Sequence, residues 1–124
     1  MAVLALENNY YRLEGVQPVE GGAVFRVALL PQCEVYQGHF PGRPVCPGVC
    51  HIELVRQCAE RLTQQRLRIR TVSVCRFPAM ASPGECPWLE ACVRVSPSDG
   101  GFSVNATLQA AGKTFLDFKG EMSV

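Results

Sequence analysis

A proline- and glycine-rich loop that runs directly into an apolar helix is the feature that most restricts the fold of this chain. Residues 38–57 read GHFPGRPVCPGVCHIELVRQ, with prolines at 41, 44 and 47 and glycines at 38, 42 and 48. Proline fixes φ and lacks an N–H donor, whereas glycine permits backbone conformations and close approaches that other residues resist. The loop is therefore predicted to be stiff and to hold His39, one of only two histidines, in place.

The helix that follows is predicted from Gly48 to about Gln64 and is the only convincing helix in the sequence. Apolar residues recur at intervals of three and four, which is typical of a helix with a wide buried face. They form two adjacent stripes, Ile52, Val55, Ala59 and Leu62 in one and Cys50, Leu54 and Cys58 in the other. We expect this helix to be central and largely buried, with Glu53 as a carboxylate near its start.

Strand patterns surround the helix. Two strands joined by a turn at Gly21-Gly22 are predicted over residues 10–16 and 23–29, with Pro31 ending the second. Four more are predicted over residues 70–77, 88–95, 102–110 and 114–122, with turns at Pro83-Gly84, at residues 96–101 and at Gly112. This order predicts an α+β fold, a single domain over residues 1–124, in which a curved antiparallel sheet wraps the helix. The exposed edges of such a sheet favour pairing with a second subunit.

Composition excludes several classes of protein. With 48% apolar residues, 19% charged residues and a net charge of +1, the chain is neither disordered nor basic enough to indicate a nucleic-acid partner. The opening MAVLALENN has no basic region before its short apolar run, so it does not read as a signal peptide. No apolar stretch reaches the eighteen residues typical of a membrane span, and we expect no membrane insertion.

The seven cysteines are interpreted as reduced thiols of a cytoplasmic protein, because their number is odd and they lie in segments that read as core. Cys46, Cys50 and His51 resemble half of a zinc site, but no second ligand pair with zinc spacing follows. We therefore expect no metal, and expect Cys46 and Cys50 to pack near the loop.

The segment Gly38–Val49, followed by Glu53 and Gln57, resembles the signature of the 3-hydroxyacyl-acyl carrier protein dehydratases of the FabZ/FabA type. Arg76-Phe77 and the later Pro83-Gly84-Glu85 resemble a strand and turn of the same family. The resemblance implies a hotdog fold, no cofactor, and a homodimer or larger assembly of dimers. Because Glu53 stands where one branch of the family has aspartate, it also implies the FabZ-like branch, which dehydrates without isomerising the double bond.

Dehydration of a 3-hydroxyacyl thioester removes a proton from C2 while the C3 hydroxyl leaves as water. His39, whose ordinary pKa is near neutrality, is the expected base. Glu53 is expected to donate a hydrogen bond or proton to the C3 hydroxyl, because burial on an apolar helix disfavours a charged carboxyl. Spacing alone does not decide whether the histidine or the glutamate moves the second proton. The Gly48 amide at the helix start is expected to receive the thioester oxygen. The resemblance implies that His39 of one subunit faces Glu53 of the other.

The remaining site residues have supporting roles. Gln57, one turn after Glu53, is expected to orient that carboxylate by hydrogen bonding. Phe40 and Val45 are expected to support the loop and line an acyl tunnel. Arg43 is either a contact to the carrier protein or its phosphate, or an exposed loop arginine. His51 is read as structural or as lining the rim of the site.

Two other functions remain open. The hotdog fold also hosts acyl thioesterases, and the departures from the family pattern at Cys46, Cys50 and His51 motivate a catalytically idle acyl-binding partner subunit as a third reading. Fold and spacing do not determine the acyl chain length. They also do not determine whether the acyl group is attached to a carrier protein or to coenzyme A.

Overall fold

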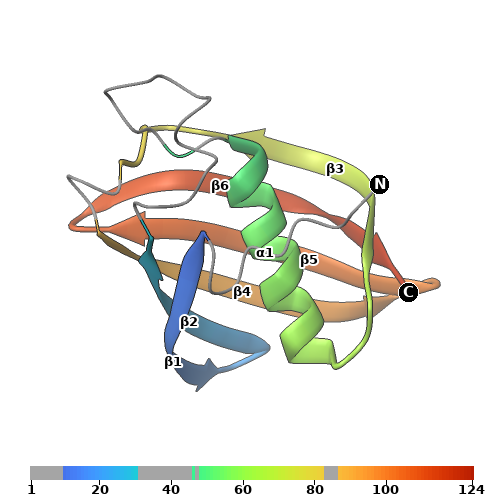
Figure 1. Ribbon diagram of the computed structural model, residues 1–124. Helices are drawn as coiled ribbons and strands as arrows, with labels where there is room; N and C mark the ends of the chain where they lie inside the picture. Colours follow the sequence, from blue (N-terminus) through green and yellow to red (C-terminus); the bar gives the residue numbers. More distant parts are fainter. Residues whose placement is uncertain (1–9, 31–45, 47, 83–86) are drawn as a thin grey trace.

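The computed structural model describes residues 10–30, 46, 48–82 and 87–124. These residues contain one helix and six strands (Figure 1). Within these residues no helix has the length and apolar character needed to cross a membrane. The elements follow in the order β1 (Tyr11–Val19), β2 (Gly22–Leu29), α1 (Gly48–Thr63), β3 (Arg68–Arg76), β4 (Trp88–Ser98), β5 (Gly101–Ala110) and β6 (Lys113–Ser123).

The six strands form one antiparallel sheet in the order β1-β2-β4-β5-β6-β3. Hairpins join β1 to β2, β4 to β5, and β5 to β6, and their tight turns use left-handed backbone conformations. Between β5 and β6, for example, both Ala111 and Gly112 have positive φ, 52° and 78°, as a twisted two-residue hairpin turn requires. The chain between β2 and β4 contains α1 and β3, and β3 crosses to the far edge to pair with β6.

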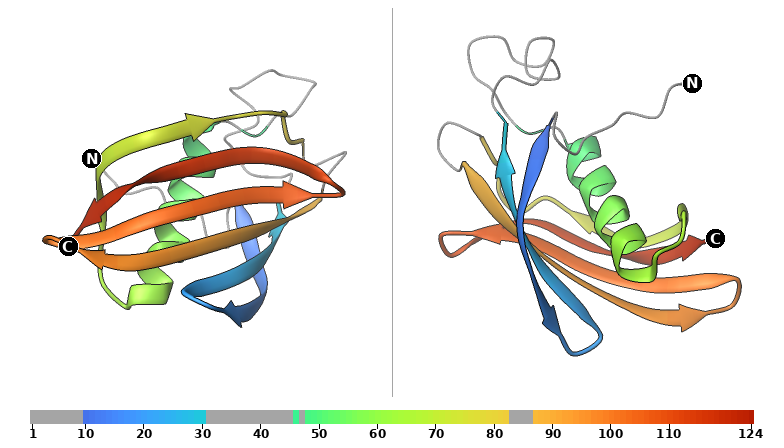
Figure 2. Two further views of the ribbon diagram at one scale, coloured as in Figure 1. Left: turned by 180° about the vertical axis from the view of Figure 1, so that it is seen from behind. Right: turned by 60° about the horizontal axis from the view of Figure 1, so that its bottom comes forward.

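The sheet curves around α1, which lies across its concave face (Figure 2). The helix packs mainly on β4 and also contacts β2 and β5. Every second residue of a strand faces the helix and contributes to the core. In β2 these residues are Ala23, Phe25, Val27 and Leu29, which are all buried, whereas their neighbours are not. The helix contributes its own buried face, consisting of Cys50, His51, Leu54, Val55, Cys58 and Ala59.

The predicted architecture, one central helix against a curved antiparallel sheet, is confirmed. Two strand ends were predicted wrongly, because prolines were interpreted as strand breakers. β1 continues through Pro18, which is tolerated since β1 is an edge strand. β4 continues through Pro97 to Ser98, past the last residue that pairs with β2, so Pro97 has a strand partner on one side only. Pro31 and the predicted Pro83-Gly84 turn lie outside the described residues.

The edge strand β3 is largely exposed along its length. Its pairing with β6 shifts register between Ile69 and Thr71 and again between Val72 and Val74. Such bulges are frequent at sheet edges, where they increase the local twist. In this structure β1 and β3 are the two edges of the sheet.

Candidate active site

A carboxylate with a full set of hydrogen-bond partners lies near the start of α1. Glu53 accepts hydrogen bonds from Arg56 through both oxygens, from Nε to Oε2 at 2.9 Å and from Nη2 to Oε1 at 2.5 Å. Gln57 Nε2 donates a third hydrogen bond to Glu53 Oε1 at 3.2 Å. The expected contact between Gln57 and Glu53 is therefore present, and its part in catalysis stays a prediction.

The Arg56 guanidinium also makes contacts away from Glu53, through its Nη1 atom. Arg56 Nη1 donates to the Leu67 carbonyl at 3.0 Å and lies 2.7 Å from Glu60 Oε2. Glu60 Oε2 in turn accepts a hydrogen bond from the Leu67 amide at 2.8 Å. The end of α1 and the start of β3 are thus linked through one arginine that also binds Glu53.

Tyr11, from the edge strand β1, completes the arrangement. Its hydroxyl donates to Gln57 Oε1 at 2.8 Å, which fixes the amide so that its nitrogen faces Glu53. Glu53, Arg56, Gln57 and Glu60 recur at helical spacing along one side of α1. At 3.6 residues per turn, this side lies opposite the stripe of α1 that is buried against the sheet.

The hydrogen-bond partners of Glu53 set the direction in which its pKa is shifted. Burial raises its pKa, but the hydrogen bonds from Arg56 and Gln57, together with the charge of Arg56, lower it by more, so the pKa lies below its ordinary value. The shift of the Glu53 pKa is therefore opposite to the one expected from burial alone, and the role of Glu53 in the reaction stays a prediction. The reason is that the apolar helix also supplies the arginine one turn away, and a paired charge is favoured where a lone one is not.

The segment that follows β3 packs against the N-terminus of α1. The helix begins at Gly48, as predicted, and a Cβ on that glycine would lie 2.7 Å from Phe77 Cζ. Just before the helix, the Cys46 amide donates to the Ala81 carbonyl at 2.8 Å. Gly48 therefore lies beneath the Phe77 ring, and a larger residue at position 48 would require that ring to move.

Four of the predicted site residues, His39, Phe40, Arg43 and Val45, lie outside the described residues. Their roles stay predictions. The described part of the site consists of Gly48, Glu53 and Gln57, all on α1, with the carboxylate five residues inside the helix.

His51 is buried rather than on the rim of the site. Its side chain is 2% exposed, its ring centre lies 6.2 Å from that of Phe77, and its Nδ1 has no hydrogen-bond partner among the described residues. Burial lowers its pKa from 6.5 to about 4. Of the two predicted roles, the structure favours the structural one.

Acidification is expected to destabilise the wild-type protein by about 3 kcal/mol more than a His51→Leu variant. The unfolded chain takes up a proton at His51 near pH 6.5, whereas the folded chain does so only near pH 4. Protonation therefore favours unfolding, and the penalty is absent above pH 6.5 and grows as the pH falls toward 4. Urea unfolding of both proteins at pH 7 and 4.5 measures the difference, and parallel pH dependence would contradict the assignment.

Three side chains of this network, Arg56, Glu60 and Tyr11, were missed from the sequence. Arg56 follows Glu53 by three residues and precedes Glu60 by four, and these spacings place side chains next to each other on a helix. The two ion pairs of Arg56 could therefore have been predicted from the sequence. Tyr11 lies 46 residues from Gln57, and no local pattern predicts that hydrogen bond.

The described cysteines, Cys46, Cys50, Cys58, Cys75 and Cys92, are thiols rather than disulfides, and the first three are buried. Among the described residues no group of three or more histidine, cysteine or acidic side chains is arranged to hold a metal ion.

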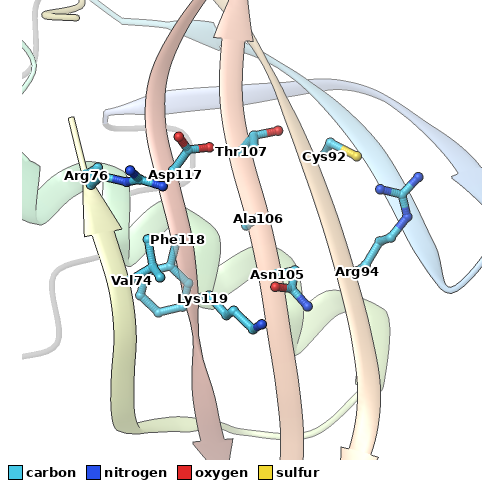
Figure 3. Close-up of a pocket in the computed structure, with 10 residues that line it drawn as sticks. All are labelled: Val74, Arg76, Cys92, Arg94, Asn105, Ala106, Thr107, Asp117, Phe118 and Lys119. Atoms are coloured by element: carbon cyan, nitrogen blue, oxygen red, sulfur yellow. The ribbon is translucent and has the colours of Figure 1, made fainter. Parts of the chain in front are cut away.

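A shallow hollow of about 310 Å³ lies elsewhere, across β3 to β6 on the face of the sheet turned away from α1 (Figure 3). Its charged lining includes Arg76 beside its cross-strand partner Asp117, and Lys119 beside Asn105. Arg94, also in the lining, donates to the Glu20 carbonyl at 3.3 Å. The sheet separates this hollow from Glu53, so it forms no part of the candidate active site.

In the part of the chain that the structure describes, one helix wrapped by a curved antiparallel sheet defines a hotdog-fold protein. Among solved structures, the chain is similar to one in the dehydratase heterocomplex ApeI:P from Xenorhabdus doucetiae, with a TM-score of 0.68 and 21% identity over 87% of this chain and 92% of that one. It is also similar to an uncharacterized protein from Erwinia carotovora subsp. atroseptica, with a TM-score of 0.57, 16% identity and 89% of each chain covered. These likenesses confirm the hotdog fold.

The family follows from the sequence match. The ApeI-like family, described as ApeI dehydratase, matches residues 16–114, and the chain belongs to this family. A shorter match, 50% identical over 34 residues, relates it to the 3-hydroxyacyl-[acyl-carrier-protein] dehydratase FabZ of Novosphingobium aromaticivorans. That match spans 27% of this chain and only 22% of the relative's length.

Proposed function

We propose that this chain, as a single hotdog domain over residues 1–124, dehydrates 3-hydroxyacyl thioesters to trans-2-enoyl thioesters. The observation that carries the proposal is the position of Glu53: it lies on the central helix five residues after Gly48, directly downstream of the loop that contains His39. Membership of the ApeI-like dehydratase family supports the reaction class.

The reaction needs two proton transfers and stabilisation of enolate-like charge on the thioester oxygen. We assign the proton transfers to His39 and Glu53 and the oxygen contact to the Gly48 amide. Phe40 and Val45 would line the acyl tunnel, and Arg43 would contact the carrier. No cofactor is required, because each step is proton transfer or hydrogen bonding.

The substrate is proposed to be carried on acyl carrier protein or coenzyme A in the cytoplasm, within fatty-acid or related acyl-chain biosynthesis. A second hotdog subunit, either a copy of this chain or a different chain, would bring His39 of one subunit to Glu53 of the other. The exposed edge strand β3 is available for such pairing. The ApeI:P heterocomplex supports a different chain as one of the two options.

The full chain should be assayed against 3-hydroxyacyl groups of increasing length on acyl carrier protein and on coenzyme A. The expected result is a trans-2-enoyl product, identified by mass spectrometry, without release of free thiol. Thiol release without enoyl product would instead support a thioesterase. Tight acyl-carrier binding with no turnover at any length would favour the idle partner subunit.

Assembly can be tested in the same preparations by sedimentation. We expect dimers or larger even assemblies, with turnover per chain falling when dilution separates the subunits. A fully active monomer would contradict a site shared between subunits.

A further inference from the structure

The side-chain amide of Gln57 is held on two sides. Its Nε2 donates to Glu53 Oε1 at 3.2 Å, and its Oε1 accepts from the Tyr11 hydroxyl at 2.8 Å. The two contacts come from different parts of the fold, since Glu53 lies about one turn earlier on α1, whereas Tyr11 is the first residue of the edge strand β1. The amide therefore links the carboxylate of the candidate site to the sheet.

Tyr11 is fixed more firmly than Gln57. Tyr11 is 4% exposed, whereas Gln57 is only half-buried. The backbone of β1 pairs with β2 at this point, with Tyr11 opposite Leu29, and the neighbouring Tyr10 carbonyl accepts from the Leu30 amide at 2.9 Å. A long, flexible glutamine side chain loses conformational entropy when it is ordered, so a partner on a fixed strand favours a single conformation.

The direction of these hydrogen bonds follows from the chemistry of the groups. An ionised carboxylate only accepts, so the amide nitrogen of Gln57 faces Glu53 and the amide oxygen faces away. The Tyr11 hydroxyl supplies a donor to that oxygen. Without this hydroxyl, Gln57 would lose one fewer hydrogen bond on turning toward water, and its nitrogen would leave Glu53 more often.

We infer that Tyr11 is a positioning residue for the proposed dehydration and that it acts on Glu53 through Gln57. The inference rests on the proposed function, and it holds whichever proton Glu53 transfers. It adds a residue of β1 to a site whose other described members, Gly48, Glu53 and Gln57, all lie on α1. The sheet then helps to align the carboxylate as well as burying the helix.

The test starts from Tyr11→Phe, which removes the hydroxyl and keeps the ring, so that the packing of β1 is retained. Tyr10→Phe is the matched control, because it makes the same change in the adjacent tyrosine, which is 0% exposed. Gln57→Ala and the double variant with Tyr11→Phe complete a double-mutant cycle. Circular dichroism and urea unfolding establish that each variant is folded.

Two readouts follow for each variant. Steady-state dehydration of a 3-hydroxyacyl thioester gives kcat and KM separately. ¹⁵N NMR measures hydrogen exchange of the Gln57 side-chain amide, whose signal is assigned by its absence in Gln57→Ala.

In Tyr11→Phe, kcat is expected to fall by about 3- to 10-fold, the kinetic equivalent of one neutral hydrogen bond, with little change in KM. The loss is modest because Arg56 still binds Glu53 in this variant. In the Gln57→Ala background, Tyr11→Phe should lower kcat no further, since the side chain through which it acts is gone. The Gln57 amide protons should exchange faster in Tyr11→Phe. Tyr10→Phe should match the wild type in both readouts.

Three results would overturn the inference. One is a wild-type kcat in Tyr11→Phe. Another is a double variant whose loss equals the product of the two single losses, because Tyr11 and Gln57 would then act independently. The third is an equal loss in Tyr10→Phe, which would assign the effect to the packing of β1.

Failure of the proposed function is distinguishable from failure of this inference. If the wild-type chain dehydrates no 3-hydroxyacyl thioester, the proposed function is wrong, and with it the part of Tyr11 in catalysis. The NMR comparison still decides whether Tyr11 holds the Gln57 amide in place. If the wild type is active and Tyr11→Phe shares its kcat, only the inference about Tyr11 is wrong.

Discussion

His39→Ala is expected to lower kcat/KM for dehydration of a 3-hydroxyacyl thioester by about 10² to 10⁴-fold, the usual contribution of a positioned acid or base. The loss is expected whether His39 accepts the C2 proton or supplies the proton that leaves with water. Alanine provides neither function, and no other side chain of the loop motif titrates near neutrality.

The chain contains its own control, because it has only two histidines. His51→Leu should retain turnover at pH 7, where the buried ring of His51 is already neutral. Circular dichroism and sedimentation of His39→Ala should match those of the wild type, which separates loss of chemistry from loss of assembly. Near wild-type turnover in His39→Ala would rule out the proposed function.

Leu54→Ala is expected to lower the free energy of unfolding by about 2 to 5 kcal/mol. Leu54 follows Glu53 directly, roughly 100° around the helix, and lies in the contact between α1 and the sheet, where it is 0% exposed. Removing its side chain leaves a cavity that the surrounding strands fill only in part. For a domain of ordinary stability, about 5 to 15 kcal/mol, this is a large fraction of the total.

Val49→Ala is the matched control for urea unfolding, because Val49 lies on the same helix and is 71% exposed. Its effect should stay within about 0.5 kcal/mol. If Leu54→Ala lowers the free energy of unfolding no more than Val49→Ala does, the side chain of Leu54 is not packed between α1 and the sheet.

Much of the fold was predictable because its signals are local. Alternating residues such as Phe25 and Val27 place a strand, and the repeat of Leu54, Val55 and Cys58 places the helix. The strand order was not predictable in the same way. β3 follows the helix in sequence but pairs with β6, at the opposite end of the chain, and that choice depends on how all six strands pack together.

The site was predictable only in part. The motif identified Gly48, Glu53 and Gln57, and the structure places them on one helix with Gln57 hydrogen-bonded to Glu53. The sequence reasoning missed the neighbour that sets the direction of the Glu53 pKa shift. Burial was considered without Arg56, although the two residues are only three positions apart.

The central helix with its carboxylate and the strands around it were determined by the sequence alone, because turn chemistry and hydrophobic period act over a few neighbouring residues. The orientations of the Arg56 and Gln57 side chains around Glu53 were decided only by the tertiary structure. They depend on Tyr11 from β1 and on the Leu67 carbonyl before β3, which meet α1 only in the folded chain. The pKa of Glu53 itself is lowered by Arg56 and Gln57, both about one turn away on the same helix, and the tertiary contacts hold those two side chains in place.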